Sequence, residues 1–448
     1  MAATPHETAA RPTRAWVLHP DLGTARSTRR APEHALAEAL ALARALPALE
    51  VVGGEVVRLR DPHPGHLFGT GKLAELEERL EQAEIDLVLV DGPVTPVQQR
   101  NLEKEWGVKL LDRTGLILEI FADRARTREG VLQVELAALS YQRTRLVRAW
   151  THLERQRGGL GFVGGPGETQ IEADRRAIDD QMVRLRRQLD RVVRTRSLHR
   201  AARARVPYPV VALVGYTNAG KSTLFNRLTG AEVMARDMLF ATLDPTMRAI
   251  RLPGAVSDGG GRKVILSDTV GFISDLPTEL VVAFRATLEE VLEADLILHV
   301  RDIAHPETGH QAADVEAILT SLGVDPAVPQ IEVWNKIDAL DPGAREAALT
   351  AAARRPDVVA VSALTGEGMD RLVAGLEAGL AASLGGAAIE EEVALPFADG
   401  RGRAWLHEAG VVLDEHSGED AVHLRVRWSP RQKAAFAARE AGSPAGEG

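Results

Sequence analysis

The sequence predicts an α/β protein with two separate strand–helix domains, joined by a long helical hairpin and followed by a small α+β domain. Three observations carry this prediction. Short apolar strands alternate with helical patterns before residue 125, and the same alternation begins again at Val210. Between these regions lie two series of apolar residues at four-and-three spacing, which is typical of paired helices. At 448 residues, the chain is long enough for several domains with their own cores.

The N-terminal domain, expected at residues 14–125, is predicted to contain a parallel sheet. Strands are expected at 15–20, 50–59, 86–92 and 108–113, and helices at 34–46, 72–82 and 97–106. Because helices separate the strands, successive strands return in the same direction and the sheet is parallel. Residues 1–13 lack the apolar core of a secretory signal and are expected to form a disordered tail.

Residues 126–205 are predicted to form an antiparallel helical hairpin. A loop with six glycines between residues 158 and 167 joins the two apolar series. Two ordinary amphipathic helices packed on a neighbouring domain would give nearly the same pattern, but they would not need so flexible a connector. The first series is Leu132, Leu136, Leu139, Leu146, Trp150 and Leu153, and the second is Ile171, Ile178, Met182, Leu185, Leu189 and Val192.

Two domains are expected after the hairpin. The second α/β domain is predicted at residues 206–385 and the small α+β domain at residues 390–436. The segment LGGAAIEEE between them has the composition of a linker. In the last domain VALPF, VVLDE and AVHLRVRW predict strands, with a short helix near residues 403–408, and residues 437–448 are expected to be disordered.

Charge is distributed unevenly along the chain. The net charge is −9, yet residues 143–205 carry sixteen arginines and no lysine against seven acidic residues. An acidic protein with one concentrated basic segment suggests a polyanion contact within that segment. A solvated helix face, with its cations paired to its own Glu and Asp, is the alternative that charge alone leaves open.

Composition excludes several classes of protein. The chain has no cysteine, which excludes disulfides and thiolate metal sites. No apolar run approaches the roughly 20 residues that a membrane-spanning helix needs. We therefore expect a cytoplasmic protein without a membrane span. As a separate prediction, we expect a monomer.

The second α/β domain opens with a loop suited to phosphate. The strand VVALV leads into GYTNAGKS, which matches G-x4-G-K-[ST] from Gly215 to Ser222. Glycines let backbone N–H groups surround phosphates, and the helix that follows adds its positive N-terminal end. Lys221 is expected to reach the β- and γ-phosphates, and the Ser222 hydroxyl is expected to bind Mg²⁺. The motif predicts a nucleoside triphosphate site.

Two further segments are expected to complete this site. Asp268 ends the strand KVILSD and can hold the Mg²⁺ shell through water, while Gly271 leaves room for its N–H to meet the γ-phosphate. In FATLDPT, Thr242 is the expected second Mg²⁺ ligand, ordered by the γ-phosphate and released after hydrolysis, with Thr246 as the competing candidate. Catalytic roles are therefore expected for Lys221, Thr242 and Gly271.

The segment NKID predicts that the base is guanine. Asp338 can accept from both N1–H and N2–H of guanine, a donor pair that adenine lacks. Asn335 can bond the N7 edge, the Lys336 stem can pack over the base, and the Ala363 N–H can meet O6. The expected GTP-binding residues are Gly215, Tyr216, Thr217, Asn218, Ala219, Gly220, Lys221, Ser222, Thr223, Phe240, Ala241, Thr242, Leu243, Asp244, Asp268, Thr269, Val270, Gly271, Asn335, Lys336, Asp338, Ser362, Ala363 and Leu364.

The motifs GYTNAGKST, FATLDPT, DTVGF, NKID and SAL, preceded by the loop GGPGETQIEADRR, resemble those of HflX-type ribosome-associated GTPases of the Obg–HflX-like superfamily. The resemblance extends through DRTGLILEIFADRARTREGVLQVELAALSYQRTRL at residues 112–146. It implies a Ras-like P-loop GTPase domain and hydrolysis of GTP to GDP with Mg²⁺. It also implies binding to the large ribosomal subunit and a role in rescuing, splitting or recycling stalled ribosomes under stress. Met247 and the segment SDGGGR depart from the family pattern.

The residue after Gly271 is Phe272, where Ras-type enzymes place the Gln that orients the attacking water. Because Phe cannot hydrogen-bond water, we expect slow intrinsic hydrolysis and a site that another group completes. The candidates are a ribosomal group, a side chain from the switch helix or a monovalent cation. Asn218 lies where some relatives hold K⁺, although an Asn there is equally able to stabilise the loop.

The basic hairpin is expected to contact ribosomal RNA, because Arg pairs with phosphate and stacks on exposed bases. Three alternatives stay open. They are a regulatory GTP-binding switch for another RNA or protein partner with little turnover, a tRNA- or membrane-directed GTPase with the same core, and a second purine nucleotide in the N-terminal domain. The expected RNA-binding residues are Arg155, Arg157, Gly158, Gly159, Gly164, Gly165, Arg175, Arg176, Arg184, Arg186 and Arg187.

Overall fold

The computed structural model describes most of the chain, and the fold and contacts are those of the described residues. These residues form two compact units: the first contains Met1–Gln188 with two later segments, and the second contains most of the remainder. The predicted α/β fold class is confirmed, whereas the domain boundaries given above stay predictions. The described residues are 11–23, 30–156, 166–203, 208–230, 239–240, 246–252, 262–274, 290–385, 389–408, 411–418, 420–428, 433 and 436–437.

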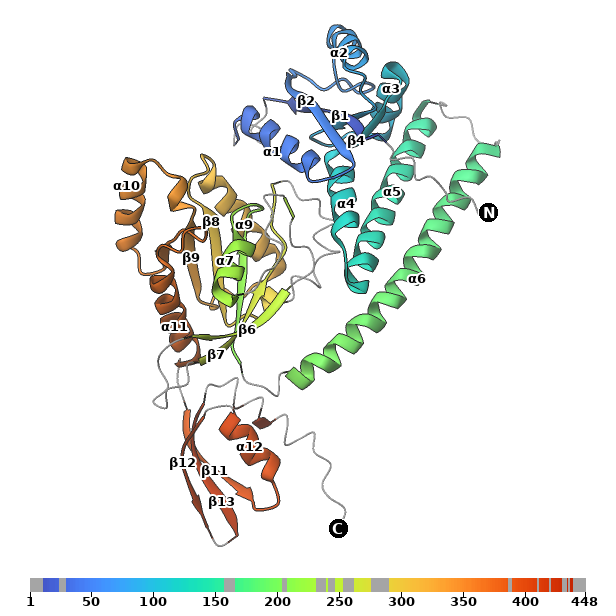
Figure 1. Ribbon diagram of the computed structural model, residues 1–448. Coiled ribbons are helices and arrows are strands. Elements are labelled where there is room, and N and C mark those ends of the chain that lie inside the picture. The colour runs from blue at the N-terminus through green and yellow to red at the C-terminus, as the bar shows by residue number, and fades with distance from the viewer. Residues whose placement is uncertain are drawn as a thin grey trace, which may run out of the picture. The chain divides into compact units, whose positions relative to one another are not determined.

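The first unit contains a parallel four-stranded sheet in the order β2–β1–β3–β4 (Figure 1). Every strand and helix predicted for this region is present within a few residues of its expected bounds. The strands are β1 (Thr13–Asp21), β2 (Leu49–Arg58), β3 (Leu87–Val90) and β4 (Lys109–Asp112), and the helices are α1 (Pro32–Arg44), α2 (Thr70–Gln82), α3 (Pro96–Trp106) and α4 (Arg113–Arg124).

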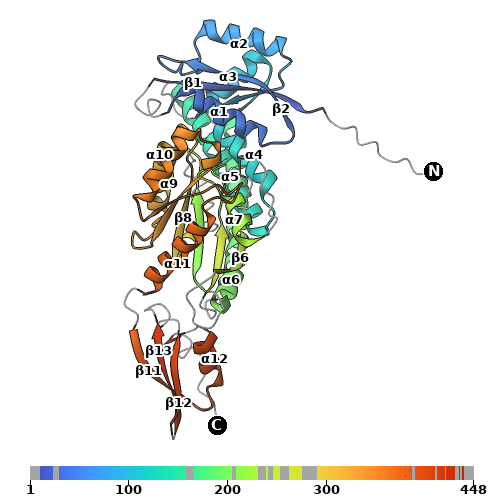
Figure 2. The same cartoon turned by 60° about the vertical axis from the view of Figure 1, so that its left-hand side comes forward.

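Helices cover both faces of this sheet (Figure 2). On one face α2 and α3 bury Leu76 and Leu102 in a core cluster with Val88 of β3. On the other face α1 packs against α4, and Leu42 and Ile117 are fully buried. Burial of a Leu or Ile side chain stabilises the fold by about 2 kcal/mol, so both layers are integral to this unit.

Helix α4 has no counterpart among the predicted elements, and a single residue explains why. Asp112 ends β4 and also caps α4, because its carboxylate accepts the Gly115 N–H at 2.9 Å. No loop residues separate the strand from the helix, so the sequence has no break that would mark the change. The same carboxylate accepts from the Tyr141 hydroxyl at 2.6 Å and pairs with Arg145 at 2.8 Å, and both residues belong to the next helix.

That next helix, α5 (Arg128–Gln156), and α6 (Pro166–Arg203) are the two predicted helices of the hairpin. Leu132 of α5 is buried, as are Met182 and Leu185 of α6, so these members of the apolar series do face an interior. Arg143 of α5 forms a 2.8 Å ion pair with Asp179 of α6, which joins the two helices part-way along their length. The side chains of Leu146, Trp150, Leu153 and Ile171 lie outside the described residues.

The second unit is built on a six-stranded sheet in the order β10–β9–β8–β5–β7–β6, in which only β6 runs antiparallel to its neighbour. Because the other five strands are parallel, the loops after them gather at one edge of the sheet, where ligands bind in such folds. The strands are β5 (Val210–Gly215), β6 (Thr246–Leu252), β7 (Arg262–Asp268), β8 (Leu296–Asp302), β9 (Gln330–Asn335) and β10 (Val358–Ala360), and the helices are α7 (Lys221–Thr229), α9 (Thr308–Leu322), α10 (Pro342–Ala353) and α11 (Met369–Gly385).

A three-stranded antiparallel sheet in the order β11–β13–β12 forms the C-terminal region, with α12 (Gly400–Glu408) beside it. The strands are β11 (Ile389–Pro396), β12 (Val412–Ser417) and β13 (Ala421–Trp428). The expected linker is wrong from Ile389 onward, because these residues begin β11. Consecutive glutamates are untypical of a strand, so the pattern did not predict one here. The Trp428 indole N–H donates to the Glu391 carboxylate at 2.7 Å, which allows an acidic side chain at this half-buried position.

Candidate guanine-nucleotide site

The predicted phosphate loop lies between β5 and α7. Gly220, the last residue before α7, has φ +92°, and a Cβ atom there would lie 2.2 Å from Asn335 Nδ2. Any residue other than glycine would therefore be strained and would collide with Asn335 at the end of β9. Asn218 also adopts a positive φ of 58° and is exposed, which a short polar residue tolerates better than most.

Lys221 is buried at the start of α7. Its ammonium donates to the backbone carbonyls of Gly215 and Tyr216 at 3.1 and 2.9 Å, which folds the side chain back over the loop. Burial lowers the pKa of Lys221 to about 8, and the nearby Asp268 carboxylate opposes that shift only in part. A charged phosphate group at the loop would favour the ammonium form, so the residue is suited to an anionic ligand.

A pair of oxygen ligands lies where a metal ion is expected. The Ser222 hydroxyl donates to Asp268 Oδ2 at 2.7 Å, and the Asp268 side chain is fully buried. Mg²⁺ prefers hydroxyl, carboxylate, water and phosphate oxygens, so this donor set fits the ion. Ser222 and Asp268 are the described residues that would hold it.

The segment after β7 is hydrogen-bonded to the phosphate loop through its backbone. The Thr217 N–H donates to the Phe272 carbonyl at 2.7 Å, and the Phe272 N–H donates to the Gly215 carbonyl at 3.1 Å. Gly271 directly precedes Phe272, and a Cβ atom there would lie 3.0 Å from the Lys221 Nζ atom. The Phe272 ring is 1% exposed, so it belongs to the core and not to the surface of the loop.

A side-chain relay reinforces the same attachment, and the sequence analysis missed it. The Tyr216 hydroxyl lies 2.8 Å from Ser274 Oγ and accepts the Ser274 N–H at 2.7 Å. The Ser274 hydroxyl in turn donates to Asp314 of α9 at 2.6 Å. The three residues belong to separate segments, and Tyr216 occupies a position that the phosphate-loop motif leaves unspecified.

Asn335 joins the phosphate loop to the loop after β10. Its Nδ2 donates to the Ala219 carbonyl at 2.8 Å, and its Oδ1 accepts the Ala363 N–H at 2.9 Å. The structure therefore gives Asn335 a bridging role that the sequence analysis did not assign. The expected contacts of Asn335 and Ala363 with the base stay predictions.

The remaining base-side residues lie close to this bridge. Lys336 pairs with Asp302 at 2.8 Å, and Asp338 is exposed in a short 3₁₀ helix, Ile337–Ala339. Ser362 is fully buried and accepts the Thr365 N–H at 3.0 Å, whereas Leu364 is 72% exposed. Arg227 of α7, which the sequence analysis missed, donates to the Ala363 carbonyl at 3.1 Å and also to Leu364.

Two residues that were predicted to bind GTP use their side chains in contacts within the protein. The Thr269 hydroxyl donates to the Leu213 carbonyl at 2.6 Å and is fully buried. The Phe240 ring is buried in the first unit, where it packs edge-to-face on Phe121 with ring centroids 4.7 Å apart. Thr223 lies in α7 and Val270 is buried beside Gly271. Ala241, Thr242, Leu243 and Asp244 lie outside the described residues.

Most of the chain matches known protein families. Four family models match it: a GTP-binding GTPase N-terminal region at residues 33–122, a GTP-binding GTPase middle region at 124–203, a 50S ribosome-binding GTPase at 210–336 and an HflX C-terminal domain at 347–445. The GTPase HflX of Magnetococcus marinus is 52% identical over 383 residues, which are 85% of each chain. The chain belongs to the HflX GTPase family.

Other HflX proteins are similar over the same extent. The GTPase HflX of Escherichia coli is 43% identical over 391 residues, 87% of this chain and 88% of its own. A GTP-binding protein of Sulfolobus solfataricus, solved with GDP, is 23% identical over 82% of this chain and 99% of its own, with a TM-score of 0.43. As a member of the HflX family, the protein is a P-loop GTPase that binds guanine nucleotides and hydrolyses GTP.

The GTP-binding GTPase middle-region model covers the arginine-rich helices at residues 124–203. Arg175, Arg184, Arg186 and Arg187 are exposed on α6, as is Arg176. Arg155 lies in α5, but its side chain is outside the described residues, as are Arg157, Gly158, Gly159, Gly164 and Gly165. In the part of the chain that the structure describes, no helix is long and apolar enough to cross a membrane.

Proposed function

We propose that this HflX-family GTPase binds the large ribosomal subunit, hydrolyses GTP when the ribosome stimulates it, and rescues, splits or recycles stalled ribosomes under stress. The family model that matches residues 210–336 bears the description of a 50S ribosome-binding GTPase, which supports this partner. The family resemblance in the phosphate loop and the Gly-rich loop supports the role in translation.

The observation that carries the proposal is the burial of Phe272. Its backbone is bonded to Gly215 and Thr217, while its ring is buried in the core. A GTPase of the Ras type needs a polar side chain at this position to orient the attacking water. The ring can supply no hydrogen bond, so a group from the bound ribosome completes the site.

Ser222 and Thr242 would hold Mg²⁺ directly when GTP is bound, and Asp268 would hold it through water. The ion would neutralise charge that develops on the phosphates during hydrolysis. Lys221 positions the β- and γ-phosphates, and the Gly271 N–H meets the γ-phosphate. The Asp338 carboxylate selects guanine by accepting from N1–H and N2–H.

The exposed arginines of α6 provide the contact with ribosomal RNA. Five of them lie within thirteen residues of one helix, Arg175–Arg187, and all are exposed. Asp179 of α6 pairs with Arg143 of α5. Exposed guanidinium groups such as those of Arg175 and Arg184 are suited to binding phosphate.

The test is GTP hydrolysis by the full chain with and without purified large ribosomal subunits, at fixed Mg²⁺ and salt. We expect stimulation of tenfold or more by large subunits and none by an equal concentration of small subunits. Tight GTP binding without stimulation by either subunit would contradict the proposal. That result would favour a regulatory GTP-binding switch with little turnover for a different partner.

A K⁺ ion held by Asn218 is a second means of completing the site. The exposed Asn218 side chain lies on the phosphate loop, where a monovalent cation could add positive charge next to the phosphates. Rates in KCl and NaCl, for the wild type and for Asn218→Ala, test this idea. Equal rates in both salts for the wild type would exclude it.

A further inference from the structure

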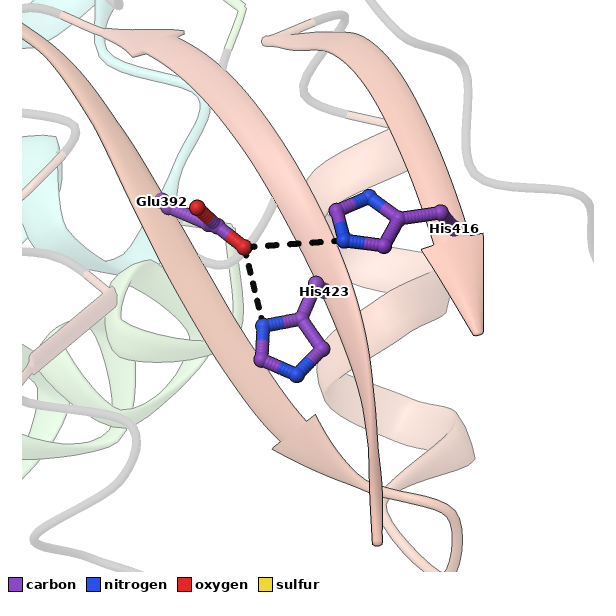
Figure 3. Close-up of side chains that lie close together, drawn as sticks. All are labelled: Glu392, His416 and His423. Carbon is purple, nitrogen blue, oxygen red and sulfur yellow. Dashed lines mark ion pairs between the residues drawn. The ribbon is translucent and has the colours of Figure 1, made fainter. Parts of the chain in front are cut away.

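The C-terminal sheet carries a cluster of two imidazoles and one carboxylate that the GTPase reaction does not use. Glu392 lies on β11, His416 on β12 and His423 on β13, and Figure 3 shows their side chains converging. One ligand atom from each residue lies within 4.8 Å of the others. Glu392 Oε1 is 2.9 Å from His423 Nδ1 and 3.8 Å from His416 Nε2.

The strand register explains why these three side chains meet. His416 and His423 are directly opposite each other across the β12–β13 pair, and their rings are nearly parallel at 11° with centroids 5.2 Å apart. His423 is opposite Ala394 across the β13–β11 pair, so Glu392 is its diagonal neighbour on the same face. The alternate residues Val422, Leu424 and Val426 face the core, which leaves the cluster on the outer face.

The His423 ring is held in place from its other side. A Cβ atom added to Gly418 would lie 3.0 Å from both Cδ2 and Nε2 of His423, so the turn between β12 and β13 packs against that edge of the ring. Nδ1 is consequently the nitrogen directed at Glu392. The cluster is therefore arranged by the turn and the register before any ligand binds.

We propose that Glu392, His416 and His423 bind a divalent transition-metal ion of the Zn²⁺ class, with water as the remaining ligand. Zn²⁺ binds imidazole nitrogen and carboxylate oxygen at about 2.0–2.2 Å, which places two tetrahedral ligands about 3.4 Å apart. The separations of 2.9 and 3.8 Å lie on either side of that value. Mg²⁺ and Ca²⁺ prefer all-oxygen sites, so two imidazoles select against them.

The surroundings permit a bound cation. Arg425 of β13 is opposite both Glu392 and Asp414. The nearest charged neighbours of the cluster along these strands are therefore one cation, Arg425, and one anion, Asp414. The cluster is open to solvent, with His416 62% exposed and His423 35% exposed. A bound ion would join all three strands of the sheet and stabilise it against unfolding.

Calorimetric titration of the full chain with ZnCl₂, with Mg²⁺ and GDP present so that the nucleotide site is filled, tests the proposal. We expect the wild type to bind one Zn²⁺ at least tenfold more tightly than His416→Ala/His423→Ala or Glu392→Gln does. The matched control is His407→Ala, because His407 lies in the same domain but pairs with Glu415 at 2.7 Å outside the cluster. The control should bind Zn²⁺ as the wild type does.

Equal Zn²⁺ affinity in the wild type, the double variant and Glu392→Gln would overturn the proposal. Melting curves without Zn²⁺ show whether each variant is folded, and the exposure of Glu392 and His416 leads us to expect little change. A second readout is the ring-proton resonances of His416 and His423, which Zn²⁺ should shift in the folded wild type at one equivalent. Shifts confined to other histidines would equally contradict the site.

Discussion

Lys221 combines two properties that oppose each other in the free protein, because it is a cation and it is buried. Burial lowers its pKa to about 8, whereas the unfolded chain keeps this proton up to about pH 10.5. The free folded protein therefore binds fewer protons than the unfolded chain between these values, and it gains stability as pH rises through that window. Triphosphate binding acts in the opposite direction because it favours the ammonium form.

We therefore expect GTP binding to take up a proton above pH 8. If the triphosphate requires the charged form, affinity should fall about fourfold between pH 7 and pH 8.5 as the free protein loses that proton. Calorimetry in two buffers with different ionisation enthalpies measures the uptake directly. Absence of proton uptake at pH 8.5 would mean that Lys221 stays fully charged without nucleotide.

Phe272 allows a second prediction at this scale. Replacement by Gln puts an amide into a core position that is 1% exposed, so we expect a loss of about 2–4 kcal/mol of unfolding free energy and no faster hydrolysis. Phe272→Leu is the control and should lower the free energy of unfolding by about 1 kcal/mol. Denaturant unfolding and single-turnover GTP hydrolysis measure the two effects. Faster hydrolysis by Phe272→Gln without a partner would show that the position faces the attacking water.

Residues of the nucleotide site could be predicted where a single residue type is required for the role. Gly220 is one such position, because its positive φ and the nearby Asn335 exclude any side chain. The contact of Arg227 with the loop after β10 and the relay that begins at Tyr216 could not be predicted, because many residue types suit a helix surface or an unspecified loop position. Their roles depend on partners 136 and 58 residues away in the chain.

At the scale of elements, the relay from Tyr216 through Ser274 to Asp314 connects the phosphate loop, the segment after β7 and α9. Removal of the Tyr216 hydroxyl withdraws the acceptor of the Ser274 N–H, and Ser274 is only 5% exposed. Loss of the acceptor for a buried N–H typically lowers the free energy of unfolding by about 1–3 kcal/mol. The segment that contains Gly271 would then be less firmly attached to the loop that binds phosphate.

Tyr216→Phe should accordingly lower both the unfolding free energy and the rate of GTP hydrolysis, with a smaller effect on GDP affinity. The control is Asp314→Asn, which keeps an acceptor for the Ser274 hydroxyl and should change each quantity less. Chemical denaturation, single-turnover hydrolysis and nucleotide titration supply the three measurements. If Tyr216→Phe hydrolysed GTP at the wild-type rate, the relay would contribute to stability and not to hydrolysis.

Elements were predictable where apolar residues alternate with polar ones and a turn separates neighbours. Helix α4 and the start of β11 lack these signals for different reasons. Asp112 ends one element and begins the next, so no turn residues mark the junction. In β11 the acidic side chains at Glu390 and Glu391 are paired with Arg427 and with Trp428, contacts that become possible only once β13 lies alongside.

At the scale of the whole molecule, an acidic protein presents a helix with five exposed arginines between Arg175 and Arg187. If these arginines bind ribosomal RNA, each phosphate contact releases counterions and makes binding depend on salt. Arg175→Ala/Arg176→Ala should weaken binding to large subunits and reduce the slope of log affinity against log salt by about 1.5. The matched control is Arg248→Ala/Arg251→Ala, which removes the same charge from exposed positions on β6.

Sedimentation of the protein with large subunits at several salt concentrations measures both quantities. Equal slopes for the two double variants would mean that net charge, and not the position of these arginines, sets the salt dependence.

The uneven distribution of charge could be seen in the sequence, but the sequence did not show which arginines pair with acidic residues of the protein. A pairing such as Arg143 with Asp179 depends on how two helices align, which composition does not specify.

The multiple contacts of Asp112 determine how the N-terminal sheet and α5 would respond to a break in the chain between them. Its carboxylate accepts from the Tyr141 hydroxyl and pairs with Arg145, so α5 is bonded to the end of β4 as well as connected to it through the chain. Limited trypsin digestion at Arg126 would cut the covalent connection and leave these bonds in place. The two fragments would then co-elute as a nicked complex under native conditions and separate only in denaturant.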